Sequence, residues 1–161
     1  STLVKIHPDG REEDMKKNFL FLTAVFVCLV FSASGWAAAS TIVGIWSVPI
    51  EAGKDKGKER SHIEIFEKNG LYYGKNVKLN NAPANLLCRK CKSEKKDQPI
   101  LGMVVIRDLK KKSDRYTGGK VLAVENGEEY DCTVSLVTPD KMKLTTYWFW
   151  GSEDHYLTRV K

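Results

Sequence analysis

The feature that most constrains this chain is an alternation of apolar and polar residues between positions 130 and 150. Apolar side chains occupy every second position over residues 130–136, and they do so again over residues 142–150 except at Thr146. A period of two is typical of a β-strand with one buried face. The intervening residues 138–141 contain a proline and an aspartate, which favour a turn. The sequence therefore predicts an antiparallel hairpin whose apolar face packs against other strands.

Further segments have strand character, and two Asn-Gly pairs suggest how some of them are joined. Asn69-Gly70 is typical of a type I′ hairpin turn, because both central residues of that turn take positive φ. A second such turn is predicted at Asn126-Gly127. Gly118-Gly119 indicates a bulge or a close backbone approach. The remaining predicted strands are 44–48, 62–68, 71–79 (with Leu71, Tyr73, Val77 and Leu79 on one face), 99–106, 116–124 and, after turns at 110–114 and 151–154, 155–160.

About eight short strands at near-even spacing, with hairpin turns and no helical periodicity, predict an all-β fold. The expected architecture is a single small antiparallel up-and-down β-barrel, and a strongly bent sandwich is the alternative. A closed barrel of eight strands removes the exposed sheet edges and leaves room for one small ligand at most.

The first 39 residues are predicted to lie outside this fold. A short basic segment at Met15 is followed by the apolar run 19–31 and by small residues that end in Ala37-Ala38-Ala39. This is the layout of a secretory signal peptide, and the run is shorter than the ~20 apolar residues of a membrane span. We therefore interpret 15–39 as a signal peptide, cleaved after Ala39 or Ala37, and 1–14 as a tag or upstream extension. Residues 40–161 form the predicted barrel domain of a periplasmic or secreted protein with no membrane span after cleavage.

The net charge limits the expected partners. The chain carries a formal charge of +6, and removal of residues 1–39 leaves this value unchanged. A basic surface suits anionic envelope components such as lipid headgroups or acidic glycans, and export argues against nucleic acid. Lysines are concentrated at 90–96 and 110–112. A solvated surface without a specific partner is the commoner explanation of such clusters.

The pair Cys88 and Cys91 has three interpretations. A disulfide that stabilises the long connection 80–98 is favoured in an oxidising compartment. A redox-active pair would benefit from the neighbouring basic residues, but redox C-x-x-C motifs begin a helix after a strand in a βαβ unit. Zinc would require further ligands, such as Cys132 with His62 or His155. Cys132 is in phase with the apolar positions of its strand, so we interpret it as a core thiol.

Catalytic motifs are missing from the sequence. There is no G-x-S-x-G, no H-E-x-x-H and no phosphate-binding glycine loop, so no catalytic residue, metal or cofactor is predicted. The aromatic run Tyr147, Trp148, Phe149 and Trp150 has two interpretations. We favour packing, in which Trp148 and Trp150 fill one end of the barrel while Tyr147 and Phe149 lie under a loop. The alternative is a surface for an apolar ligand or a protein partner.

Several motifs carry a family resemblance. Gly44-x-Trp46 together with Arg159 resembles the lipocalin-like arrangement, in which an arginine packs across an early tryptophan and closes the end of the barrel. An ordered series of motifs resembles the exported bacterial domain-of-unknown-function family 2147 over nearly all of 40–161. The series comprises Gly44-x-Trp46, Asn69-Gly70-x-Tyr72-x-Gly74-Lys75, 99–103, 118–121, Asn126-Gly127-x-x-Tyr130 and Thr158-Arg159. The resemblance implies a lipocalin-like barrel in the envelope or outside the cell, and no established activity. Ala123-Val124 and Leu157 depart from the family pattern.

These observations favour an exported, non-enzymatic β-barrel that binds a small apolar or amphipathic ligand or an envelope component. One alternative is a structural or protein-interaction module whose barrel is packed by its own side chains. The other is a thiol-redox factor that uses Cys88 and Cys91.

Overall fold

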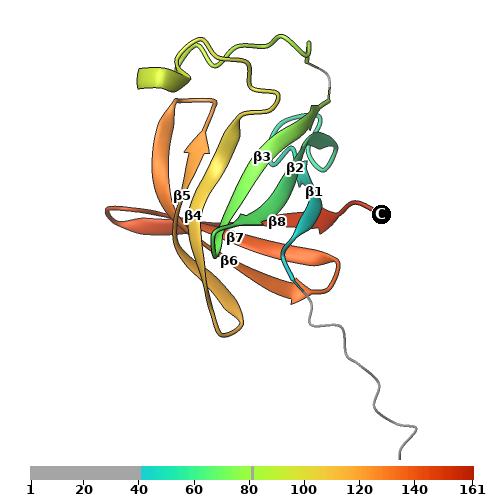
Figure 1. The fold of residues 1–161 in the computed structure, drawn as a ribbon. Coiled ribbons are helices and arrows are strands. Elements are labelled where there is room, and N and C mark those ends of the chain that lie inside the picture. The colour runs from blue at the N-terminus through green and yellow to red at the C-terminus, as the bar shows by residue number, and fades with distance from the viewer. Residues whose placement is uncertain (1–40, 81) are drawn as a thin grey trace, which may run out of the picture. The chain divides into compact units, whose positions relative to one another are not determined.

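A computed structural model describes residues 41–80 and 82–161 as a closed barrel of eight antiparallel strands. Each strand pairs with its neighbours in the chain, and β8 pairs with β1 to close the sheet (Figure 1). The strands are β1 (Gly44–Pro49), β2 (Glu59–Lys68), β3 (Leu71–Leu79), β4 (Val104–Lys112), β5 (Arg115–Ala123), β6 (Glu128–Thr138), β7 (Lys141–Trp148) and β8 (Gly151–Arg159). The predicted all-β up-and-down barrel is confirmed.

Residues 1–14 and the predicted signal peptide 15–39 lie outside the described residues. Between β3 and β4 the described part of the chain forms one short 3-10 helix, η2 (Ser93–Lys95). A search of the same residues for a helix long and apolar enough to cross a bilayer finds none.

The alternation over residues 130–150 produces the hairpin β6–β7, as predicted. Cys132, Val134, Met142 and Leu144 are buried, whereas Asp131, directly before Cys132, is exposed. The core is formed by such inward positions from all eight strands, together with residues of the long connection between β3 and β4. The buried face of this hairpin therefore forms one wall of the barrel.

The two Asn-Gly pairs behave differently. Asn69 and Gly70 both have positive φ (54° and 76°), which confirms the type I′ turn between β2 and β3. At the second pair only Gly127 has positive φ, and its amide donates to the carbonyl of Ala123 (2.8 Å) in a four-residue turn. The second type I′ prediction is therefore wrong. The position is constrained by packing, because a Cβ on Gly127 would lie 1.8 Å from the carbonyl oxygen of Lys90.

Two strand boundaries also differ from the prediction. Residues 99–103 are not part of a strand, because the amide of Met103 bonds to the Ile100 carbonyl in a tight turn and β4 begins only at Val104. The predicted turn at 110–114 consists only of residues 113–114, because β4 extends to Lys112 and β5 begins at Arg115. The predicted turn at 151–154 is part of β8, which pairs with β7 as far as Trp148. Backbone pairing along the hairpin outweighs the turn composition of Gly-Ser-Glu-Asp.

The face of β3 that enters the barrel is the opposite of the predicted one. Tyr72, Gly74 and Asn76 are buried, whereas Tyr73 is only partly buried and stacks on Phe66. The register of β2 against β3 shifts between His62 and Ile63, so the last residues of β3 leave strict alternation. Gly74 fits this inward position because a Cβ there would meet Ile63, Ile65 and Ile106 at about 3 Å. The bulge predicted at Gly118-Gly119 is present in β5.

Arg159 closes one end of the barrel against Trp46. Its guanidinium lies 4.2 Å from the centre of the Trp46 ring, which is 0% exposed. The same guanidinium donates to the carbonyls of Thr41 (2.6 Å), Val43 (2.9 Å) and Pro139 (2.8 Å). Gly44 allows this packing, since a Cβ there would lie 2.6 Å from Arg159 Nη1. One side chain thus joins the segment before β1, the β6–β7 turn and the end of β8.

We expect Arg159→Leu to lower the free energy of unfolding by about 2–4 kcal/mol, because it removes a cation–π contact and three hydrogen bonds from a charged donor. Urea unfolding followed by tryptophan fluorescence measures the change. Arg115→Leu is the matched control, because Arg115 is exposed on β5; it should shift stability by less than about 0.5 kcal/mol. Equal effects of the two substitutions would contradict the closing role of Arg159.

Candidate functional site

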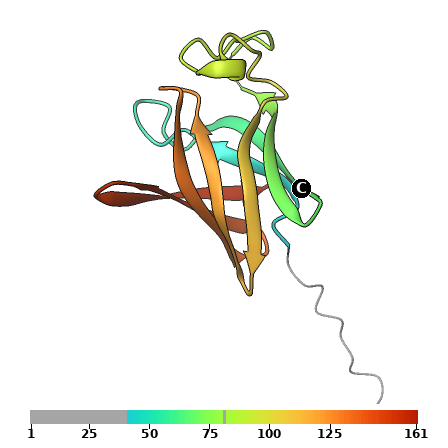
Figure 2. The ribbon, with the colours of Figure 1, turned by 60° about the vertical axis from the view of Figure 1, so that its left-hand side comes forward.

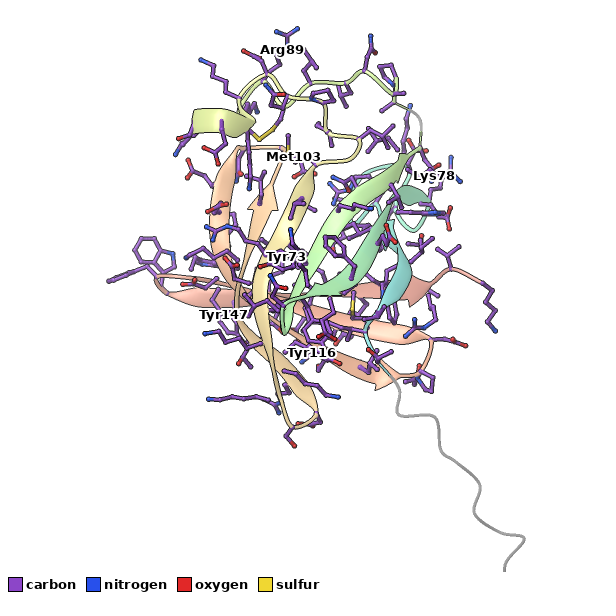
Figure 3. All side chains as sticks on the ribbon, viewed as in Figure 1. Tyr73, Lys78, Arg89, Met103, Tyr116 and Tyr147 are labelled. Atoms are coloured by element: carbon purple, nitrogen blue, oxygen red, sulfur yellow. A yellow bond between two sulfur atoms is a disulfide. The ribbon has the colours of Figure 1, made fainter. Side chains whose placement is uncertain are left out.

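The end of the barrel opposite Trp46 is covered by chain connections. Residues 50–58, 80–103, 124–127 and 149–150 all join strands at this end, which we call the mouth. The described part of the longest connection, 82–103, lies over the ends of the strands in both orientations of the ribbon (Figure 1; Figure 2). Figure 3 shows Arg89 on this connection, Met103 beneath it where the chain enters β4, and Tyr116 toward the other end.

A cavity of about 850 Å³ opens at the mouth. Its walls are mainly apolar and come from the strands and from Ala82, Leu86 and Ile100 of the long connection. The apolar strand residues that line it include Val48, Ile63, Leu79, Val105, Val121, Leu144 and Leu157. This volume lies within the range of about 300–1,000 Å³ typical of small-molecule sites. The barrel is thus packed at the Trp46 end and hollow at the mouth.

Two polar side chains face this cavity from adjacent strands. Asn76 on β3 is 5% exposed and Ser61 on β2 is 7% exposed, and both line the cavity. No side-chain nitrogen or oxygen that is shut off from solvent within 41–80 and 82–161 lacks a hydrogen-bond partner, so the Asn76 amide and the Ser61 hydroxyl are open to the cavity that they line. Sequence reasoning missed both residues, because Asn76 lies on the face of β3 that was expected to point outward.

Ionisable groups gather at the rim of the cavity. Arg60 forms an ion pair with Glu125 across the mouth. His155 Nδ1 lies 2.7 Å from Glu51 Oε1, and its Nε2 lies 3.3 Å from the Thr146 hydroxyl. The contact between His155 and Glu51 ties the connection between β1 and β2 to β8.

Among the described residues, Glu51, Glu153 and His155 are the set whose ligand atoms lie close enough (within 4.8 Å) to hold a metal ion. Both nitrogens of the His155 ring already have hydrogen-bond partners. The structure does not group Cys132 with either histidine, as the weaker zinc interpretation required.

The aromatic run is divided by the β7–β8 turn. Trp148 lines the cavity and is 40% exposed, and Tyr147 points outward, with its hydroxyl 3.1 Å from that of Thr133. Phe149 and Trp150 form the turn itself and are 93% and 84% exposed. The favoured packing interpretation is therefore wrong, because Trp150 does not enter the barrel and Trp148 leaves the mouth open. The two-residue turn places these side chains at a hairpin tip, beyond the last paired strand residues.

Cys88 and Cys91 form a disulfide, drawn as the yellow bond in Figure 3. The two residues are 1% and 3% exposed. The Cys88 amide donates to the carbonyl of Gln98 (2.8 Å), so the disulfide sits where the connection folds back on itself. Cys132 is a buried free thiol, and desolvation raises its pKa to about 12, which keeps it protonated and unreactive.

Ion pairs anchor the long connection to the barrel. Lys92 lies 2.7 Å from Glu128, and Lys95 lies 3.3 Å from Glu129 at the start of β6. Arg107 on β4 makes two hydrogen bonds to Glu129 (2.7 and 3.3 Å). These bonds, followed by that from Lys95, lower the pKa of Glu129 to about 2. Part of the predicted lysine cluster is therefore engaged with carboxylates of the protein itself.

Comparison with known proteins identifies a family and a structural neighbour. The family described as "Uncharacterized protein conserved in bacteria (DUF2147)" matches residues 44–159. No curated protein matches the sequence significantly. Among solved structures, protein HP1028 from the human pathogen Helicobacter pylori, described as belonging to the lipocalin family, is similar with a TM-score of 0.65 and 20% sequence identity. The match covers 75% of this chain and 84% of that chain, and at this identity it shows a shared fold.

We expect a Cys88→Ala/Cys91→Ala variant to lose about 2 kcal/mol of stability, because the disulfide closes only a short loop of the unfolded chain. Denaturant unfolding with and without a thiol reductant measures this loss. The reductant should destabilise the wild type and leave the double variant unchanged. A variant as stable as the oxidised wild type would contradict a stabilising role.

The lowered pKa of Glu129 predicts a defined acid response. A carboxylate with a depressed folded pKa stabilises the fold above its unfolded pKa of about 4.5, and this contribution is lost as pH falls toward 2. Arg107→Met should therefore flatten the decline of stability between these pH values in thermal melts, whereas Arg115→Met should not. Identical pH profiles for the wild type and Arg107→Met would show that Arg107 does not set this pKa.

Proposed function

Because the chain belongs to the DUF2147 family of uncharacterised bacterial proteins, and because its barrel is hollow at one end, we propose that it is an exported, non-enzymatic binding protein. Its cargo would be one small apolar or amphipathic molecule held inside the barrel. The observation that carries this proposal is the cavity of about 850 Å³ with predominantly apolar walls. A concave, apolar and largely preformed space with a few polar groups is the usual form of a small-molecule site.

The division of the barrel into two ends supports a carrier role. The buried Trp46 and the guanidinium of Arg159 close one end, so a ligand has a single route in and out through the mouth. The long connection contributes Leu86 and Ile100 to the walls, so a bound molecule would be enclosed by both the barrel and this connection. Transfer of an apolar ligand from water onto such walls is favourable in proportion to the apolar area removed from water.

The cysteines favour binding over thiol chemistry. Attack on a disulfide requires access to one of its sulfurs, and both residues of the Cys88–Cys91 pair are almost fully buried. A stabilising disulfide is also consistent with the proposed export, because structural disulfides persist mainly in oxidising compartments. The packed-barrel alternative is disfavoured by the cavity itself.

Binding of the neutral, apolar fluorophore N-phenyl-1-naphthylamine tests the proposal. The wild type should enhance its fluorescence with saturable, one-to-one binding. Val121→Trp, which places an indole in the cavity, should weaken binding at least tenfold, and Ala123→Trp near the mouth serves as a second blocking variant. Circular dichroism establishes that each variant is folded.

Val137→Trp is the matched control, because Val137 is 52% exposed on β6 and does not line the cavity. A Phe149→Ser/Trp150→Ser variant controls for binding at the exposed hairpin tip. Both should bind the fluorophore as the wild type does. If the tip variant alone abolishes binding, or if the folded blocking variants bind normally, the barrel interior is not the site.

A further inference from the structure

The polar pair inside the cavity limits the chemistry of the ligand. Asn76 and Ser61 lie on adjacent strands, and both are more than nine-tenths buried in a mainly apolar surrounding. Within 41–80 and 82–161 no side-chain nitrogen or oxygen that is shut off from solvent lacks a hydrogen-bond partner, so the polar atoms of this pair are open to the cavity, where water or a ligand can hydrogen-bond to them. The Asn76 amide offers two donors and one acceptor, and the Ser61 hydroxyl offers both functions. A ligand that carries a hydrogen-bonding group would satisfy them.

The backbone of Asn76 holds this amide in a fixed place. The backbone N–H of Asn76 donates to the carbonyl of Met103 (3.0 Å), and the backbone carbonyl of Asn76 accepts from the N–H of Gly102 (2.7 Å). Gly102 has a φ of 83°, which suits the turn that makes this contact. The Asn76 side chain therefore projects from a part of β3 whose backbone is hydrogen-bonded to the last residues of the long connection. A polar group held in a fixed position favours selective recognition of a ligand over non-specific binding of apolar molecules.

The charges around the cavity disfavour an anionic ligand. Arg60 is the only arginine or lysine among the described residues that line it, and it is paired with Glu125. The other carboxylates and the histidine that line it, Glu51, Glu153 and His155, contact one another, with His155 Nδ1 2.7 Å from Glu51 Oε1 and Nε2 4.0 Å from Glu153 Oε2. An ionised carboxylate or phosphate brought into this space would lose its hydration without gaining a free cationic partner. The positive net charge of the chain therefore lies elsewhere on its surface.

We propose that the cavity selects uncharged amphiphiles, whose hydroxyl or amide group hydrogen-bonds to Asn76 and Ser61 while the apolar body lies against the walls. This inference rests on the proposed function, since it assumes that the cavity holds a ligand. It adds a chemical class, the neutral alcohols and amides, and it excludes fatty acids as preferred cargo.

Competition between probes of equal chain length tests the selection. 1-Dodecanol and dodecanamide, below their solubility limits, and dodecanoate and dodecylamine, below their micelle concentrations, would compete with N-phenyl-1-naphthylamine for the wild type at neutral pH. The alcohol and the amide should bind at least about tenfold more tightly than dodecanoate. Asn76→Leu keeps the side-chain volume and the backbone bonds, and it should weaken binding of the alcohol and the amide about two- to tenfold, the range expected for one hydrogen bond. Ser61→Ala should act in the same direction.

The fluorophore separates the failure of this inference from that of the proposed function. If the wild type does not bind N-phenyl-1-naphthylamine, the proposed function itself fails. If the fluorophore binds but Asn76→Leu and Ser61→Ala leave the affinities of the alcohol and the amide unchanged, only the polar selection fails. Tighter binding of dodecanoate or dodecylamine than of the neutral probes also overturns it. Asn85→Leu, at an exposed position outside the cavity, is the matched control and should behave as the wild type.

Discussion

The contact between Arg159 and Trp46 is the constraint on which the rest of this structure depends. A meander of eight strands closes only if its first and last strands meet, and these two residues lie opposite each other in the short β1–β8 pairing. That pairing is brief, so the guanidinium adds bonds to three carbonyls that strand pairing does not use. Gly44 supplies the space that the guanidinium needs. The contact between Arg159 and Trp46 therefore closes the sheet and seals one end of the barrel at the same time.

Sealing one end leaves the other end free to be hollow. At the mouth the strands are held together by the connections, above all by residues 80–103, which the Cys88–Cys91 disulfide and the ion pairs of Lys92 and Lys95 fix against β6. A connection of this length without such restraints would be costly to order. Because it is restrained, it supplies apolar walls to the cavity and brings Met103 and Gly102 against Asn76. The same connection thus stabilises the mouth and contributes to the lining of the cavity.

Much of the fold follows from the sequence alone, because alternation and the Asn69-Gly70 turn are local signals. The β6–β7 hairpin was predictable in this way, whereas the packing of Arg159 on Trp46 was expected only from the family resemblance. The candidate site was harder to predict from the sequence. Asn76 points inward in phase with Tyr72 and Gly74, on a face of β3 that its pairing with neighbouring strands decides, and the position of Gly127 is set by the distant Lys90 backbone. Such features depend on contacts between segments far apart in the chain. The aromatic run was misassigned for a similar reason, since pairing of β7 with β8 decides which residues form the turn.

The central claim is that the barrel holds one small molecule at its mouth. Native mass spectrometry of the protein, purified without detergent from the compartment in which it accumulates, tests this most directly. The account predicts a folded chain, lighter by the two hydrogens of one disulfide, with a single non-covalent adduct that dissociates on collisional activation. A folded chain that is bare, and that stays bare after incubation with an excess of N-phenyl-1-naphthylamine or 1-dodecanol, would contradict it.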